Sequence, residues 1–194
     1  IHLSRTVALS IPDGDNLELS SITTTVHIGA HTDAPNHYAA HGASIDERPL
    51  DLYLGLCQVM TVEVARGTRI QPADLTTSIR APRLLFRTNT FPDPNDFNED
   101  FAALSPELVH ACHASGVRLV GLDTPSVDLC NDRELLSHTV IAGYDMAILE
   151  GVVLHHVDDG LYTLIALPLP LKGADASPVR AVLVPTSAAA AFQR

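Results

Sequence analysis

Short apolar runs rich in β-branched residues mark the first third of the chain. Two of these runs, residues 22–28 and 59–64, have the length and composition of β-strands. Residues that typically form turns interrupt the same region at Pro12, Gly14, Pro35, Gly42 and Pro49. We therefore expect residues 1–66 to consist mainly of strands and turns.

Strand and helix patterns alternate in the rest of the chain. Ser105 and Pro106 have the order of an N-cap and a first-turn proline, so they predict a helix that ends at Gly116. Residues 133–142, followed by Gly143, favour a second helix. Apolar runs of strand length occupy residues 84–86, 117–122, 146–149, 162–167 and 179–184. This alternation predicts crossover βαβ units with some parallel pairing, and hence an α/β fold with more strand than helix.

Composition limits the class of protein. The chain has 194 residues, of which 46% are hydrophobic and 18% charged, and we expect a single domain over residues 1–194. Acidic residues outnumber basic ones 23 to 12 without a basic cluster, so nucleic acid and anionic membrane surfaces are not expected partners. The apolar run at 161–171 contains two prolines and is too short to cross a bilayer. The alanine run at 188–191 predicts an exposed helical tail.

The cysteines indicate a reducing environment. Cys57, Cys112 and Cys130 are odd in number, widely spaced and outside any CxxC pair. Neither a disulfide framework nor a cysteine-type zinc site is therefore expected. The location predicted from this pattern is the cytoplasm.

Ten histidines stand out in a chain without tryptophan, and four of them lie between residues 27 and 41. Such enrichment in one segment suggests metal or proton chemistry. Glycine and proline make a helix improbable there, and in an extended chain alternate residues share a face. His27, His31 and Asp33 would then present two imidazoles and a carboxylate on one side, which suits a divalent cation such as zinc or manganese. Pro35 would end the run and turn His37 back toward the same place.

Two residues outside this segment are candidates for the same site. His138 lies in the predicted second helix. Glu150 follows the predicted strand at 146–149, and open α/β sheets place their ligands beyond the carboxyl ends of the strands. We expect both side chains to reach a common metal ion.

The histidine segment also resembles a known signature. His27-x-Gly-Ala-His31-x-Asp33-Ala-Pro-x-His37 is similar to the HxGTHxDxPxH motif of metal-dependent cyclase-like hydrolases, and within that group the chain most resembles the bacterial kynurenine formamidases. The likeness extends over residues 20–185. Further blocks in the family's order lie at residues 42–46, 49–50, 116–126, 147–151, 166–169 and 176–181.

The resemblance implies a function and a site. His27, His31 and Asp33 would hold one metal, and Asp33, His138 and Glu150 a second, so that Asp33 bridges the two. His37 would be the acid/base residue. The family further implies zinc, a homodimer and a β-rich swivelling β/β/α fold with a mixed sheet and few helices. The implied reaction is hydrolysis of N-formyl-L-kynurenine to L-kynurenine and formate, a step of tryptophan degradation.

One departure from the family concerns the N-terminal region. The family has a Trp-Pro-Gly-Asp stretch and a longer segment before the histidines, whereas this chain has Ile11-Pro-Asp-Gly-Asp15. This difference leaves open which residues of this chain contact an aromatic substrate.

Other functions fit parts of the pattern. A related hydrolase that opens a cyclic amide such as isatin would share the fold and the metal site. A metal-binding module without turnover would keep the ligands but leave His37 inert. Simple cation storage would require D-x-D-x-D-G loops, and a serine hydrolase would require a G-x-S-x-G elbow, and the chain has neither.

Overall fold

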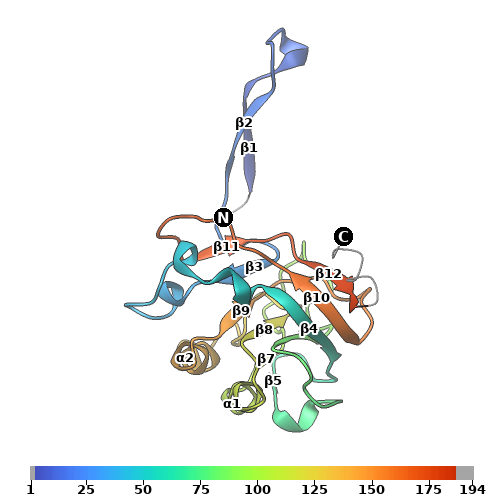
Figure 1. Cartoon of the computed structure of the whole chain (residues 1–194). Helices are drawn as coiled ribbons and strands as arrows, with labels where there is room; N and C mark the ends of the chain where they lie inside the picture. The colour runs from blue at the N-terminus through green and yellow to red at the C-terminus, as the bar shows by residue number, and fades with distance from the viewer. Residues whose placement is uncertain (1–2, 187–194) are drawn as a thin grey trace.

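A six-stranded mixed sheet forms the centre of the protein, whose computed structural model describes residues 3–186 (Figure 1). The strand order is β12-β10-β4-β6-β8-β9. Strands β4, β6, β8 and β9 run parallel to one another, whereas β10 is antiparallel to both β4 and β12. The bounds are β4 (Leu54–Thr61), β6 (Arg83–Arg87), β8 (Leu119–Leu122), β9 (Ala147–Leu149), β10 (Gly160–Ile165) and β12 (Val182–Pro185).

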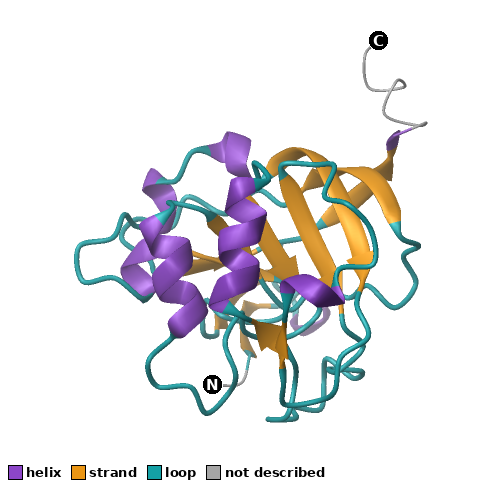
Figure 2. Ribbon diagram, turned by 90° about the horizontal axis from the view of Figure 1, so that it is seen from below, coloured by secondary structure: helices purple, strands orange, loops and turns teal. Residues whose placement is uncertain are grey.

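Two helices cover one face of this sheet (Figures 1 and 2). Helix α1 (Pro106–Ala114) begins as the sequence predicts, with the Leu108 N–H donating to the Ser105 Oγ at 3.0 Å. Helix α2 (Leu136–Gly143) connects β8 to β9. The mixed sheet with few helices that the sequence predicts is confirmed.

Both faces of the central sheet are buried. On β6, Leu84 and Phe86 pack toward the helices, while Leu85 packs into a second cluster on the opposite face. Strands buried on both sides have apolar residues at every position, which explains the continuous apolar runs in the sequence. The described part of the chain holds no helix long and apolar enough to cross a membrane.

Three small sheets complete the fold. Strand β3 (His31–Asp33) pairs with β11 (Ala176–Pro178), and β5 (Arg69–Ile70) pairs with β7 (Ala103–Leu104). Strands β1 (Ser4–Leu9) and β2 (Leu19–Thr23) form a hairpin that projects from the body of the molecule (Figure 1). Short 3₁₀ helices lie at Ile11–Asp13, Pro35–His37, Ile45–Glu47, Leu50–Leu52 and Pro72–Asp74.

Several predicted boundaries are wrong, each for a local reason. The strand expected over residues 22–28 ends at Thr23, and Gly29, with φ +56°, turns the chain before β3. The helix expected from residue 133 starts at Leu136, because Leu135 has φ +50°. The strand expected at 179–184 is divided, since the Val179 N–H donates to Ala30 O at 2.8 Å and leaves β12 to begin three residues later. The alanine run at 188–191 lies outside the described residues.

Candidate metal centre

Strand β3 lies across the carboxyl end of β9. The His31 N–H donates to Glu150 O at 3.1 Å, and the Glu150 N–H donates to His31 O at 2.9 Å. Between these ligand candidates, Thr32 Oγ1 donates to Ile148 O at 2.5 Å. Backbone pairing and a buried hydroxyl therefore fix the histidine strand directly against the strand that ends in Glu150.

Two glycines permit this close approach. Gly151 has φ +65°, and a Cβ added to it would lie 2.3 Å from the carbonyl oxygen of Gly29. Any side chain at position 151 would therefore push the segment before β3 away from the end of β9. The close packing therefore requires glycine at position 151, directly after Glu150.

Asp33 lies at the centre of four other side chains. Its Oδ1 is 3.0 Å from His27 Nδ1 and 3.5 Å from His31 Nε2. Its Oδ2 is 3.5 Å from His138 Nε2. Glu150 Oε2 lies 3.2 Å from His31 Nε2, and Glu150 Oε1 lies 3.9 Å from His138 Nε2. All five residues line one cavity of about 500 Å³.

The chemistry of these atoms fits a bound cation. His31 Nδ1 donates to the Gly29 carbonyl at 2.9 Å, and His138 Nδ1 donates to Asp128 Oδ2 at 2.8 Å, so the Nε2 atom of each ring faces carboxylate oxygens. Among the described residues, both Asp33 oxygens and His138 Nε2 are buried and have no hydrogen-bond partner. Such atoms are costly to bury. A histidine held through one nitrogen and free at the other is the usual arrangement of a metal ligand.

The electrostatics of the cluster also favour a cation. Burial opposes a charged imidazole, yet Glu150 raises the pKa of His31 to about 9. Against the same burial, Asp128 and Asp33 raise the pKa of His138 to about 10. Burial alone would raise the pKa of Asp33, but its histidine neighbours hold that pKa well below its usual range. The carboxylates therefore create a negative potential that stabilises positive charge placed among them.

His27 and His37 lie at the more open side of the cavity. The expected extended run does not include His27, because the chain bends there, but its Nδ1 still reaches Asp33. Its Nε2 donates to Asp175 Oδ2 at 2.9 Å. His37 follows Pro35 in a 3₁₀ turn, and its Nδ1 lies 3.5 Å from the same Asp175 oxygen. The His27 and His37 ring centroids are 4.2 Å apart.

Two overlapping groups of donor atoms come together around Asp33. His31, Asp33 and Glu150 offer ligand atoms within 4.8 Å of one another, and so do His27, Asp33 and His37. Asp33 is common to both groups. Asp33 Oδ1 faces both His27 and His31, whereas Asp33 Oδ2 faces His138. His37 has the position of either a ligand or a proton carrier.

Asp128 and Asp175 support the site but do not stand out in the sequence. Asp128 accepts hydrogen bonds from the ring of His138 and from the backbone N–H groups of Ser137 and His138. Asp128 belongs to no motif and to no repeat, so the sequence does not mark it. Asp175 directly precedes β11, which the sequence does not predict as a strand, so no pattern marks Asp175 either.

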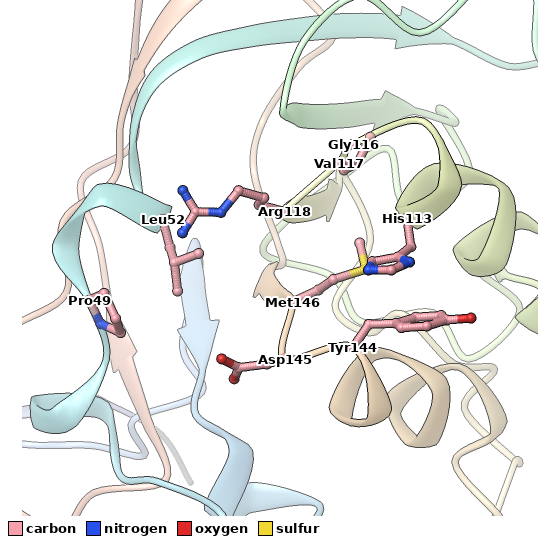
Figure 3. A pocket seen from close by; sticks show the side chains of 9 residues that line it. All are labelled: Pro49, Leu52, His113, Gly116, Val117, Arg118, Tyr144, Asp145 and Met146. Carbon is pink, nitrogen blue, oxygen red and sulfur yellow. The ribbon is translucent and has the colours of Figure 1, made fainter.

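A second cavity, of about 320 Å³, lies at the opposite edge of the sheet, where β8 and β9 begin (Figure 3). Its charged groups are already paired: Arg118 Nη1 lies 2.9 Å from Asp51 Oδ2, and Asp145 accepts from Arg48 at 2.5 Å. The His113 and Tyr144 rings stack at 3.7 Å (Figure 3). These contacts join elements of the fold and leave no converging donor atoms, so the cavity around Asp33 is the candidate site.

Comparison with known proteins identifies the family. The Cyclase family model matches residues 1–129. The chain belongs to the Cyclase family. The kynurenine formamidase of Maricaulis maris (strain MCS10) is 42% identical to this cyclase-family chain over 169 residues, which cover 86% of this chain and 80% of that protein. The resemblance noted in the sequence is confirmed.

Solved structures share the fold of this cyclase-family protein. A potential metal-dependent hydrolase with cyclase activity superposes with a TM-score of 0.79 at 27% identity, covering 93% of this chain and 85% of that one. Isatin hydrolase A from Labrenzia aggregata superposes with a TM-score of 0.76 at 20% identity, covering 94% of this chain and 83% of that one. The likeness to isatin hydrolase A, at 20% identity, shows the fold alone.

Proposed function

We propose that this protein is a metal-dependent amidohydrolase that converts N-formyl-L-kynurenine to L-kynurenine and formate. The observation that carries the proposal is the 42% identity to a kynurenine formamidase over 86% of the chain. The buried His, Asp and Glu donors around one cavity support it, because such donors suit a divalent metal. On this proposal residues 1–194 act as one hydrolase domain.

The proposed cofactor is a pair of divalent ions, most simply Zn²⁺, with Mn²⁺ as the alternative. The ligands would be His27, His31, Asp33, His138 and Glu150, with Asp33 shared between the ions. The two donor groups that have Asp33 in common support this number. Divalent ions bound there would supply Lewis acidity and a lowered pKa for a water molecule.

The chain's own residues would supply orientation and proton transfer. Hydrolysis of a formamide needs an activated water, stabilisation of charge on the carbonyl oxygen and a proton for the departing nitrogen. His37 lines the cavity beside the donor cluster and keeps about a third of its side chain exposed, at 37%. Neutral His37 would take a proton from the attacking water and return it to the leaving nitrogen. Asp175 contacts His37 and would orient it.

A homodimer is proposed from the N-terminal hairpin. An isolated two-stranded hairpin is marginally stable in water, and exposed apolar surface typically marks an interface. All of β2 is exposed, and the hairpin's exposed apolar side chains are Val7, Ile11, Leu17, Leu19 and Ile22. Packing of this hairpin on a second copy would bury them. Light scattering should then give twice the chain mass, and a mass of one chain would contradict the dimer.

The second candidate function is hydrolysis of a cyclic amide, which the isatin hydrolase neighbours favour through their shared fold. The two candidates are separated by one comparison of substrates. The metal-loaded protein should release formate from N-formyl-L-kynurenine with a higher kcat/KM than it shows for the opening of isatin. A preference for isatin would reverse the assignment, and turnover of neither would support a metal-binding module.

A further inference from the structure

A loop with three phenylalanines borders the metal cavity. Residues 88–102 connect β6 to β7 without helix or strand. Phe91 and Phe97 line the same cavity as the donor residues. Their ring centroids are 5.8 Å apart, and Phe101 lies 6.3 Å from Phe91 and 6.2 Å from Phe97, all at steep interplanar angles. The three rings therefore form one edge-to-face cluster.

The cluster is anchored at one end and open at the other. Phe101 is 1% exposed, whereas Phe97 is 62% exposed. Exposed apolar surface that borders a cavity is a common feature of sites that bind an apolar group. The exposed faces of this cluster therefore indicate a surface that receives an apolar group.

A buried carboxylate holds the base of the loop. Asp123, at the end of β8, accepts hydrogen bonds from the Thr88 N–H at 2.9 Å, the Thr88 hydroxyl at 2.7 Å and the Asn89 N–H at 2.8 Å. Thr90 Oγ1 accepts from the Ala102 N–H at 2.9 Å, which ties the two ends of the loop together. The aromatic wall is thus fixed to the sheet rather than carried on a free loop.

We propose that Phe91 and Phe97 bind the aryl ring of an N-aryl formamide, and that Asp123 is the positioning residue for this wall. The inference rests on the proposed function and adds the subsite for the substrate's ring. The ring of an N-aryl formamide is separated from the carbonyl carbon by the nitrogen alone. A wall that borders the cavity of the donor atoms is therefore where this ring lies when the carbonyl faces them.

Tyr38 is another aromatic residue near the donors, with its ring centroid 5.0 Å from that of His138, but it is not among the residues that line the cavity. The chain has no tryptophan, and Ile11-Pro-Asp-Gly-Asp15 lies in the connection between β1 and β2, at the far end of the projecting hairpin (Figure 1). The remaining apolar lining of the cavity is small or aliphatic, such as Pro125 and Leu135. Among the described residues that line the cavity, Phe91 and Phe97 are thus the aromatic side chains apart from the histidines.

The test compares a flat ring with a puckered one. Formanilide and N-cyclohexylformamide have the same formamide group and similar size, and formate release is measured for both. Phe97→Ala should raise KM for formanilide about 2- to 10-fold more than it raises KM for N-cyclohexylformamide, which is the range of one aromatic contact. Phe97→Leu should have the same selectivity loss, and Leu54→Ala, an exposed apolar residue on β4, should have none.

Asp123→Asn tests the positioning role, because it places an amide NH₂ against backbone N–H donors. It should reduce the preference for formanilide over N-cyclohexylformamide, through a larger rise in KM for formanilide. An equal loss with both substrates would overturn the positioning role, and unchanged KM values in Phe97→Ala would overturn the subsite.

A binding measurement separates this inference from the proposed function. Saturation-transfer NMR of acetanilide and N-cyclohexylacetamide requires no turnover. Stronger transfer to acetanilide that is lost in Phe97→Ala supports the subsite even if the protein releases no formate, an outcome that would refute the proposed function alone. Equal transfer to both amides, unaffected by Phe97→Ala, would refute the subsite.

Discussion

His31 and Glu150 are joined twice, through the backbone and through their side chains. Reciprocal N–H to carbonyl bonds of 3.1 and 2.9 Å link the two residues, and His31 Nε2 lies 3.2 Å from Glu150 Oε2. The same pairing that attaches β3 to the end of β9 therefore sets the spacing of two ligand candidates. A metal centre built this way is part of the sheet, so its donors are organised before a metal binds.

Asp33→Asn should be the most damaging single change in the cluster. The amide removes the negative charge shared by both donor groups, whereas His27→Asn or His31→Asn affects one group each. We expect Asp33→Asn to lose most bound metal and to lower kcat/KM more than either histidine variant does. Elemental analysis and formate release, measured on the three purified variants, test this order. A histidine variant with the larger loss would contradict a bridging role.

Asp128→Asn should weaken metal binding without removing a ligand. Asp128 accepts from His138 Nδ1 at 2.8 Å and so holds the ring with Nε2 toward Asp33. Loss of such a partner typically lowers metal affinity about 10- to 100-fold. Titration of metal-free protein with Zn²⁺ measures the effect. Asp51→Asn is the matched control, since Asp51 pairs with Arg118 at the opposite edge of the sheet and should leave the affinity unchanged.

His37→Ala separates proton transfer from metal binding. If His37 is the acid/base residue, metal content stays near the wild-type value and kcat falls about 10²- to 10⁴-fold. The loss should fall mainly on kcat, because the interaction is made in the transition state. If His37 is a ligand, metal content falls with activity and added metal restores part of the rate. Wild-type turnover would exclude His37 from the mechanism.

The sequence predicts the type and order of the main elements but not the path of the chain between them. The parallel core strands and both helices follow from apolar runs and caps such as Ser105. His27 was expected on the strand of His31, yet positive φ at Gly29 bends the chain, and the contact of His27 with Asp33 survives because the bend brings its ring back. Asp128 was missed because its role depends on distant hydrogen bonds, which no local pattern encodes.

Thiol labelling tests the burial of the cysteines. Burial raises the pKa of Cys57 and Cys112 to about 12, whereas Cys130 is exposed. A thiol reacts as its thiolate, and a raised pKa keeps that form scarce at pH 8. Iodoacetamide at pH 8 should therefore modify one thiol in the native protein and three after denaturation, counted by mass spectrometry. Rapid modification of two or three native thiols would contradict the core packing.

The most direct test of the account is a metal titration of the metal-free protein with formate release from N-formyl-L-kynurenine as the readout. Bound metal is counted by elemental analysis at each point. The account predicts no turnover without metal, activity that rises with added Zn²⁺ or Mn²⁺, and saturation at two ions per chain. Full formate release by metal-free protein, or metal-saturated protein that releases none, would contradict it.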